Sequence, residues 1–255
     1  MHTTGILSAL AEEQRGLAER LQAAQRSTHA GREFVSGVLE GQRVVLVLSR
    51  IGKVAASTTA AALIERFGAT RMLFTGVAGG MGPGVNVGDM VVADGFVQHD
   101  IDASPLFPRY EVPLYGQARF ASDAALTAML FEASNDLFAG ASPLFDAETR
   151  AEFGLHDMRV HQGLMASGDQ FISTTAASEA LRAGLAAQGH APLAVEMEGA
   201  AVAQVCLDYG VPFAAVRTIS DRADDAAHVD FPRFIRGVAS RYALELVPRW
   251  LARLP

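Results

Sequence analysis

The pattern of apolar and polar positions alternates between two periods along the chain. Short runs of consecutive apolar residues, bounded by glycine, proline or polar residues, predict buried strands, and longer segments with apolar residues three or four positions apart predict helices. The predicted strands cover residues 5–10, 34–39, 44–48, 71–75, 90–97, 158–166, 193–195 and 213–219. The predicted helices cover residues 12–22, 55–67, 121–138, 178–188, 197–209 and 231–251.

Three segments lack a sustained period. Residues 76–88 are glycine-rich, residues 98–118 contain several prolines, and residues 135–157 are irregular. Glycine and proline interrupt regular structure, so we interpret the first two segments as loops.

The order of these elements predicts an α/β fold. Strands that are apolar at nearly every position and alternate with helices are typical of a parallel sheet covered on both faces. The strands at 34–39 and 44–48 flank a glycine-containing turn and add a hairpin. We therefore expect a three-layer α/β/α architecture around a mixed, mainly parallel, twisted sheet. No linker or block of charge divides the sequence, so residues 1–255 are expected to form a single domain.

Composition and charge exclude several classes of protein. Of the 255 residues, 50% are hydrophobic and 19% charged, which excludes general disorder. The 28 acidic and 21 basic residues give a net charge of −7, which argues against nucleic acid or an anionic membrane as a partner. The single cysteine, Cys206, cannot form an internal disulfide. Without a basic leader or a membrane-spanning window, the chain is expected to be a soluble cytoplasmic protein.

Unusual residues stand where the first predicted strands end. The ligand crevice of such a sheet lies beyond the carboxyl ends of its strands. Glu12 and Glu13 follow the first strand, although the positive end of a helix dipole would also favour carboxylates there. Ala78 and Gly79 lie in a glycine run that would let backbone N–H groups approach a ligand. That run is neither a dinucleotide fingerprint nor a P-loop.

Two later strands are followed by further candidates. Phe171 and Ile172 come after the strand at 158–166. The sequence is compatible with two interpretations: the Phe171 ring stacks on a planar ligand, or it packs into the core after a Gly-Asp turn. Ser220 and Asp221 follow the strand at 213–219, where a carboxylate could also cap the next turn.

Glu196, Met197 and Glu198 open the predicted helix at 197–209. The helix dipole would favour carboxylates here too, but this helix is apolar enough to be largely buried, and buried carboxylates need partners. The seven histidines are scattered without metal-ligand spacing, so we expect no metal, and no nucleophilic elbow is present.

Seven motifs taken together are similar to one known family. They are, in chain order, Gly-Ile-x-x-Ala-x-x-Glu-Glu at 5–13, Ile-Gly-Lys-Val-Ala-Ala at 51–56, Thr-Gly-Val-Ala-Gly-Gly at 75–80, Val-Gly-Asp at 87–89, Ser-Gly-Asp-x-Phe-Ile at 167–172, Val-Glu-Met-Glu at 195–198 and Arg-x-Ile-Ser-Asp-x-Ala-Asp at 217–224. This series, which covers nearly the whole chain, resembles the methylthioadenosine/S-adenosylhomocysteine nucleosidases of the purine nucleoside phosphorylase superfamily.

The resemblance implies hydrolysis of the N-glycosidic bond of an adenine thionucleoside, with water as co-substrate and no cofactor. By motif position, Asp221 is the acid at adenine N7, and Glu13 activates water, with Glu12 as the fallback. Glu198 would bind the ribose hydroxyls, with Met197 against the sugar. The remaining residues of the substrate site would be Phe171, Ile172, Ala78, Gly79, Ser220 and Glu196. The resemblance also implies a homodimer in which the loop at 98–118 closes the 5′-alkylthio pocket of the partner.

Two departures from the family pattern affect the substrate. Val77 stands where the family often has serine, and Arg50 where it often has glycine. Three alternatives stay open: a phosphate-dependent phosphorylase in which Arg50 binds phosphate, a non-catalytic nucleoside-binding or storage protein, and hydrolysis of another adenine nucleoside such as an aminodeoxyfutalosine-like compound.

Overall fold

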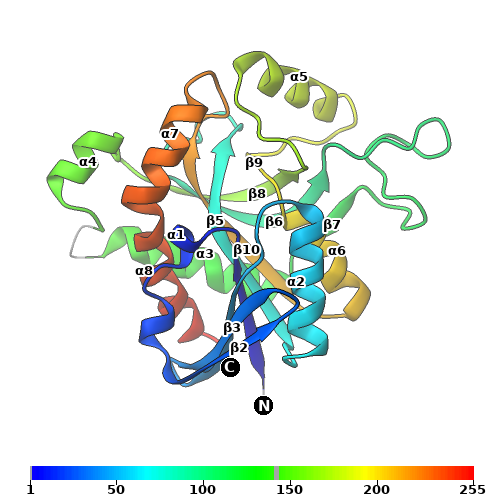
Figure 1. Cartoon of the computed structure of the whole chain (residues 1–255). Helices are drawn as coiled ribbons and strands as arrows, with labels where there is room; N and C mark the ends of the chain where they lie inside the picture. Colours follow the sequence, from blue (N-terminus) through cyan, green and yellow to red (C-terminus); the bar gives the residue numbers. More distant parts are fainter. Residues whose placement is uncertain (1, 141–143) are drawn as a thin grey trace.

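The computed structural model describes residues 2–140 and 144–255, and its strands and helices alternate along the chain (Figure 1). The strands are β1 (Thr3–Ser8), β2 (Gln22–His29), β3 (Arg32–Leu39), β4 (Gln42–Leu48), β5 (Arg71–Gly80), β6 (Met90–Gln98), β7 (Arg119–Ala121), β8 (Val160–Ser167), β9 (Ala194–Glu196) and β10 (Phe213–Asp221). The α-helices are α1 (Ala11–Gln14), α2 (Lys53–Glu65), α3 (Ala124–Ala139), α4 (Ala147–Phe153), α5 (Thr175–Ala186), α6 (Gly199–Tyr209), α7 (Ala227–Phe234) and α8 (Ser240–Leu251). A 3-10 turn spans Ala18–Arg20, and a π-helical segment, Ile235–Ala239, joins α7 to α8.

The strands form one mixed sheet in the order β10-β6-β8-β9-β5-β1-β4-β3-β2, with β7 on β6. Strand β10 also pairs with β5, so β5, β9, β8, β6 and β10 close into a ring. The pairs β1–β4, β1–β5, β5–β10, β6–β8 and β8–β9 are parallel. Antiparallel pairing extends beyond the predicted hairpin to β5–β9 and β6–β10.

Helices cover both faces of the sheet, which confirms the predicted α/β fold. Figure 1 places α3, α7 and α8 on one side and α2 and α6 on the other. Neighbouring residues of one strand pack into different cores: Ile6 of β1 lies in the core that contains Trp250 of α8, and Leu7 lies in the core that contains Leu63 of α2. Because both faces are buried, these strands are apolar at consecutive positions.

Several predicted boundaries are wrong. The helix predicted at 12–22 is reduced to the single turn of α1, and the 3-10 turn and β2 follow it. The loop predicted from residue 76 begins later, because β5 continues to Gly80. The segment predicted as irregular contains α4, and its residues 141–143 lie outside the described residues. Among the described residues, no helix has the length and apolar character needed to cross a membrane.

Candidate active site

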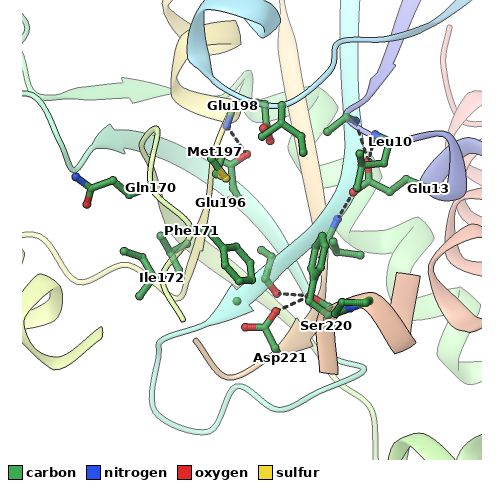
Figure 2. A pocket seen from close by; sticks show the side chains of 18 of the residues that line it. Leu10, Glu13, Gln170, Phe171, Ile172, Glu196, Met197, Glu198, Ser220 and Asp221 are labelled. Atoms are coloured by element: carbon green, nitrogen blue, oxygen red, sulfur yellow. Dashed lines mark hydrogen bonds between the residues drawn. The ribbon is translucent and has the colours of Figure 1, made fainter. Parts of the chain in front are cut away.

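One cavity of about 420 Å3 brings the predicted site residues together (Figure 2). All ten line it: Glu13, Ala78, Gly79, Phe171, Ile172, Glu196, Met197, Glu198, Ser220 and Asp221. The remaining lining residues are Ala9, Leu10, Ile51, Val77, Gln170, Val195, His228, Phe231 and Pro232, of which only Val77 was singled out from the sequence, as a departure from the family pattern. Figure 2 shows Glu13, Glu198 and Asp221 around the cavity.

Glu13 is held by backbone N–H groups from two elements. Its Oε2 accepts hydrogen bonds from the N–H groups of Ala9 at 2.8 Å and Leu10 at 2.9 Å, at the turn between β1 and α1. Its Oε1 accepts a bond of 3.0 Å from the N–H of Val77 in β5. A Cβ atom on Gly76 would lie 2.7 Å from Oε1, so glycine is required there for the carboxylate to reach the strand.

Burial raises the pKa of Glu13, whose exposed fraction is 4%, while the Arg217 guanidinium and the three backbone bonds lower it. A raised pKa makes the ionised carboxylate a stronger base than an exposed glutamate. Glu12, the fallback base, lines a neighbouring cavity and not this one.

Asp221 ends β10, directly after an irregularity in the strand. The register with β5 shifts between Ile219 and Asp221, and such a bulge re-aims a side chain. Its Oδ2 accepts a bond of 2.8 Å from the Ser220 hydroxyl and its Oδ1 one of 2.9 Å from the N–H of Ala223. A Cβ on Gly79 would lie 3.0 Å from Oδ1, so this glycine also leaves room for a carboxylate. Burial raises the pKa of Asp221, which favours the protonated form that an acid needs.

Glu196 and Glu198 lie at the start of α6 but face different partners. Glu196 accepts bonds from the N–H of Gly199 at 2.9 Å, from the Ser167 hydroxyl and from Arg217 Nη2 at 2.6 Å. Its carboxylate is therefore bound mainly by protein groups. Arg217 Nη2 lies 3.9 Å from Glu198 Oε2, so this one buried cation serves both carboxylates.

Glu198 has fewer partners and a strongly shifted pKa. Its Oε1 accepts a bond of 2.9 Å from the N–H of Gly52, directly before α2. Burial and the nearby Glu196 raise the pKa of Glu198 to about 8. Its remaining lone pairs can accept hydrogen bonds from a ligand in the cavity.

The other walls of the cavity are apolar and partly aromatic. The rings of Phe171 and Phe231 meet edge to face with centroids 5.5 Å apart, and Phe171 keeps an exposed fraction of 47%. Figure 2 shows Phe171 extending toward the middle of the cavity, with Ile172 beside it and Met197 above. A planar ring system could stack on this wall.

Comparisons with known proteins identify the family of this chain. A family model described as "Phosphorylase superfamily" matches residues 3–249. The 5′-methylthioadenosine/S-adenosylhomocysteine nucleosidase of Shewanella denitrificans is 35% identical over 95% of this chain and 96% of its own length. The corresponding protein of Anoxybacillus flavithermus is 36% identical over 95% of this chain and 94% of its own length. The chain belongs to this nucleosidase family.

Solved structures of the family share the fold over the whole chain. The nucleosidase of Colwellia psychrerythraea in complex with adenine has a TM-score of 0.86 and 31% identity, covering 99% of this chain and 96% of that one. The nucleosidase of Neisseria meningitidis in complex with methylthio-immucillin-A has a TM-score of 0.85 and 30% identity, covering all of both chains.

Arg217, the first residue of the motif at 217–224, was assigned no role from the sequence, but it is the buried cation beside Glu196 and Glu198. Its exposed fraction is 1%, it stacks over the Phe74 ring at 4.0 Å, and its Nε and Nη1 atoms have no hydrogen-bond partner among the described residues. The signal was a charged residue inside an otherwise apolar strand, where it must meet a buried carboxylate. Among residues 2–140 and 144–255, no group of three or more potential ligand side chains is arranged to hold a metal ion.

Proposed function

We propose that this chain hydrolyses the N-glycosidic bond of 5′-methylthioadenosine and S-adenosylhomocysteine, releasing adenine and a thioribose sugar. The family supplies the reaction class, since its relatives carry this name and one solved structure holds a transition-state inhibitor. The observation that carries the assignment is the meeting of three buried carboxyl groups, those of Glu13, Glu198 and Asp221, on one cavity.

Asp221 acts as the acid in this proposal. The glycosidic bond breaks through an oxocarbenium-like transition state, so the base must leave as a neutral molecule. A carboxylic acid that stays protonated can donate its proton to adenine N7, and burial of Asp221 favours that form. The hydroxyl of Ser220 holds the group in place and stabilises the carboxylate that forms.

Glu13 acts as the base that directs water to C1′ of the sugar. It must be ionised to accept a proton, and Arg217 together with the three backbone N–H bonds opposes the effect of burial. Oε2 accepts two of those bonds, but Oε1 accepts only the bond from Val77 and keeps a second lone pair, so a water molecule can still donate to Oε1.

Glu198 binds the 2′- and 3′-hydroxyls of the ribose, and Met197 packs against the sugar. Glu196 lines the cavity, but its partners favour a positioning role: it holds Arg217 and the first turn of α6, and so fixes Glu198. Phe171 stacks on adenine, the Ile172 backbone binds its edge, and Ala78 and Gly79 form the floor of the purine site.

A homodimer completes the proposal. Large apolar side chains are exposed directly before α2 and on it, on the segment between β6 and β7, and on α6: Ile51, Val54, Leu106, Leu114, Tyr115, Leu207 and Tyr209. Figure 1 shows the segment between β6 and β7 extending from the body of the molecule on the side of α6. Such exposed apolar side chains favour a protein interface, in which this segment would close the 5′ pocket of the partner.

The phosphorylase alternative lacks a phosphate site in the cavity, whose lining residues include neither arginine nor lysine. The test is to incubate the protein with a panel of adenine nucleosides, with and without phosphate, and to measure free adenine and the sugar product. We expect adenine from methylthioadenosine without phosphate, and a loss of at least about a hundredfold in Glu13→Gln and in Asp221→Asn. Undiminished turnover in both variants would refute the assigned roles. Cleavage only with phosphate, or binding without cleavage, would refute the function.

A further inference from the structure

A second cavity, of about 800 Å3, adjoins the first. Both are lined by Ala9, Leu10 and Ile51, so the two meet beside the catalytic residues. The first cavity is mainly apolar, whereas the second carries seven charged side chains: Glu12, Arg15, Glu19, Arg26, Arg32, Glu33 and Arg50. A ligand that occupied both would place an apolar part in one and a charged part in the other.

Three arginines of the second cavity, Arg15, Arg32 and Arg50, have no carboxylate partner among the described residues, and the last two lie close enough for their charges to interact. Arg50 Nη2 donates to the backbone carbonyl of Gly31 at 2.6 Å. Arg32 donates only to backbone carbonyls, among them that of Ala55 at 3.2 Å, and its Nε is buried without a partner. Burial lowers the pKa of Arg32, and the charge of Arg50 lowers it further, which means that the two cations repel each other. An anion between them would remove that repulsion.

Arg26 provides a contrast within the same cavity. Its Nη1 lies 2.5 Å from Glu33 Oε1, so its charge is already neutralised. Glu12, by contrast, makes no hydrogen bond or ion pair with any residue that the structure describes. Among the described residues, the second cavity therefore offers charged groups of both signs without an ion-pair partner: the guanidiniums of Arg15, Arg32 and Arg50 and the carboxylates of Glu12 and Glu19.

The backbone of Arg50 has an unfavourable conformation. Its φ is 66°, in the left-handed region that costs a non-glycine residue energy, and the residue immediately precedes Ile51, which lines both cavities. A glycine would adopt this φ freely but would remove from the second cavity the guanidinium that lies nearest to Ile51 in the sequence.

We propose that the second cavity binds the charged α-amino-acid end of a 5′-thioether substituent, with Arg50 and Arg32 on its carboxylate and Glu12 on its ammonium group. In S-adenosylhomocysteine, two methylene groups separate the sulfur from the carbon that bears both charges. The adenosine part occupies the first cavity, and the chain passes over Ile51, whose exposed fraction is 52%. A 5′-methylthio group ends before it reaches the charged residues. Arg50 is thus a specificity-determining residue for amino-acid-bearing substrates.

This inference rests on the proposed function, and the experiment separates the two. Adenine release is measured for S-adenosylhomocysteine, methylthioadenosine and 5′-(propylthio)adenosine, which has a similar chain without the charges. The proteins are the wild type, Arg50→Gln, Glu12→Gln and the control Arg26→Gln, which removes from the same cavity a cation that is already paired with Glu33.

We expect Arg50→Gln to lower kcat/KM for S-adenosylhomocysteine roughly tenfold, through KM, because it removes a charge-assisted hydrogen bond. Glu12→Gln should lower it about threefold, as expected for a partly exposed ion pair. The two uncharged substrates should change less than about twofold in both variants, and Arg26→Gln should change none of the three.

Equal losses on all three substrates, no loss in Arg50→Gln, or an equal loss in Arg26→Gln would overturn the inference while leaving the hydrolase intact. Phosphate that accelerates cleavage would also overturn it, because the arginines would then serve a phosphorolytic reaction. No adenine release by the wild type from any of the three substrates would instead refute the proposed function.

Discussion

Replacing Gly76 by alanine tests how Glu13 is positioned without changing any functional group. The added Cβ would lie 2.7 Å from Glu13 Oε1, 3.1 Å from Cδ and 3.3 Å from Oε2. To regain ordinary van der Waals contact, the nearer oxygen must move by about 0.7 Å. The carboxylate is tied to three backbone N–H groups, so it cannot move this far without weakening some of those bonds.

The size of the effect follows from that displacement. A shift approaching 1 Å at a catalytic group can cost about a hundredfold in rate, so we expect kcat of Gly76→Ala to fall roughly tenfold to a hundredfold. The backbone bonds also lower the pKa of Glu13, so weakening them should move the acidic limb of the rate profile to higher pH. A buried N–H left without a partner costs about 1–3 kcal/mol of unfolding free energy.

The assay is adenine release at saturating methylthioadenosine, together with urea unfolding. Gly5→Ala is the control, because its added methyl group meets the flexible end of Leu63 at 3.0 Å, on another buried strand and away from the cavity. We expect Gly5→Ala to lose stability but to keep its kcat. If Gly76→Ala folds and turns over within about threefold of the wild type, with an unchanged pH profile, Glu13 does not depend on its backbone bonds as described.

Two further outcomes follow from the buried carboxyl groups. The pH profile of kcat/KM should be bell-shaped, falling at low pH as Glu13 becomes protonated and at high pH as Asp221 ionises. The residual activity of Glu13→Gln should lack the acidic limb, and that of Asp221→Asn should lack the basic limb. Profiles that keep both limbs in both variants would contradict the assignments. The pKa of Glu198 is raised from 4.5 to about 8 by folding, so its contribution to stability is present at pH 4.5 and falls as the pH rises toward 8, by about 1.4 kcal/mol per pH unit. Urea unfolding at several pH values should therefore show a shallower pH dependence in Glu198→Gln than in the wild type, and parallel curves would contradict this.

The sequence predicted most strands because their burial on both faces is visible as unbroken apolar runs. The same pattern located the site, since Glu13, Glu198 and Asp221 stand at the ends of such runs or beside them. The strand β2 could not be predicted this way, because every one of its residues is exposed and it is held only by pairing with β3. Backbone hydrogen bonds do not require apolar side chains, so the pattern of apolar residues does not reveal this strand.

Two other differences have local causes. Leu17 and Leu21 have helical spacing, but they are buried as the two residues that flank a 3-10 turn, the second directly before β2, and the predicted helix did not form. The glycines at 76 and 79 were interpreted as part of a loop, whereas they lie inside β5 and make room for the carboxylates of Glu13 and Asp221. Close approach between strands that are distant in the sequence cannot be inferred from one segment alone.

Water as the nucleophile is the central claim, and the oxygen that reaches C1 of the sugar tests it most directly. The protein is incubated with methylthioadenosine and phosphate in 18O-labelled water, and the sugar is analysed by mass spectrometry at once, with a blank of preformed unlabelled sugar to correct for exchange. Activation of water by Glu13 requires methylthioribose that carries one 18O atom at C1, formed at the same rate without phosphate. An unlabelled sugar phosphate, formed only when phosphate is present, would contradict the account.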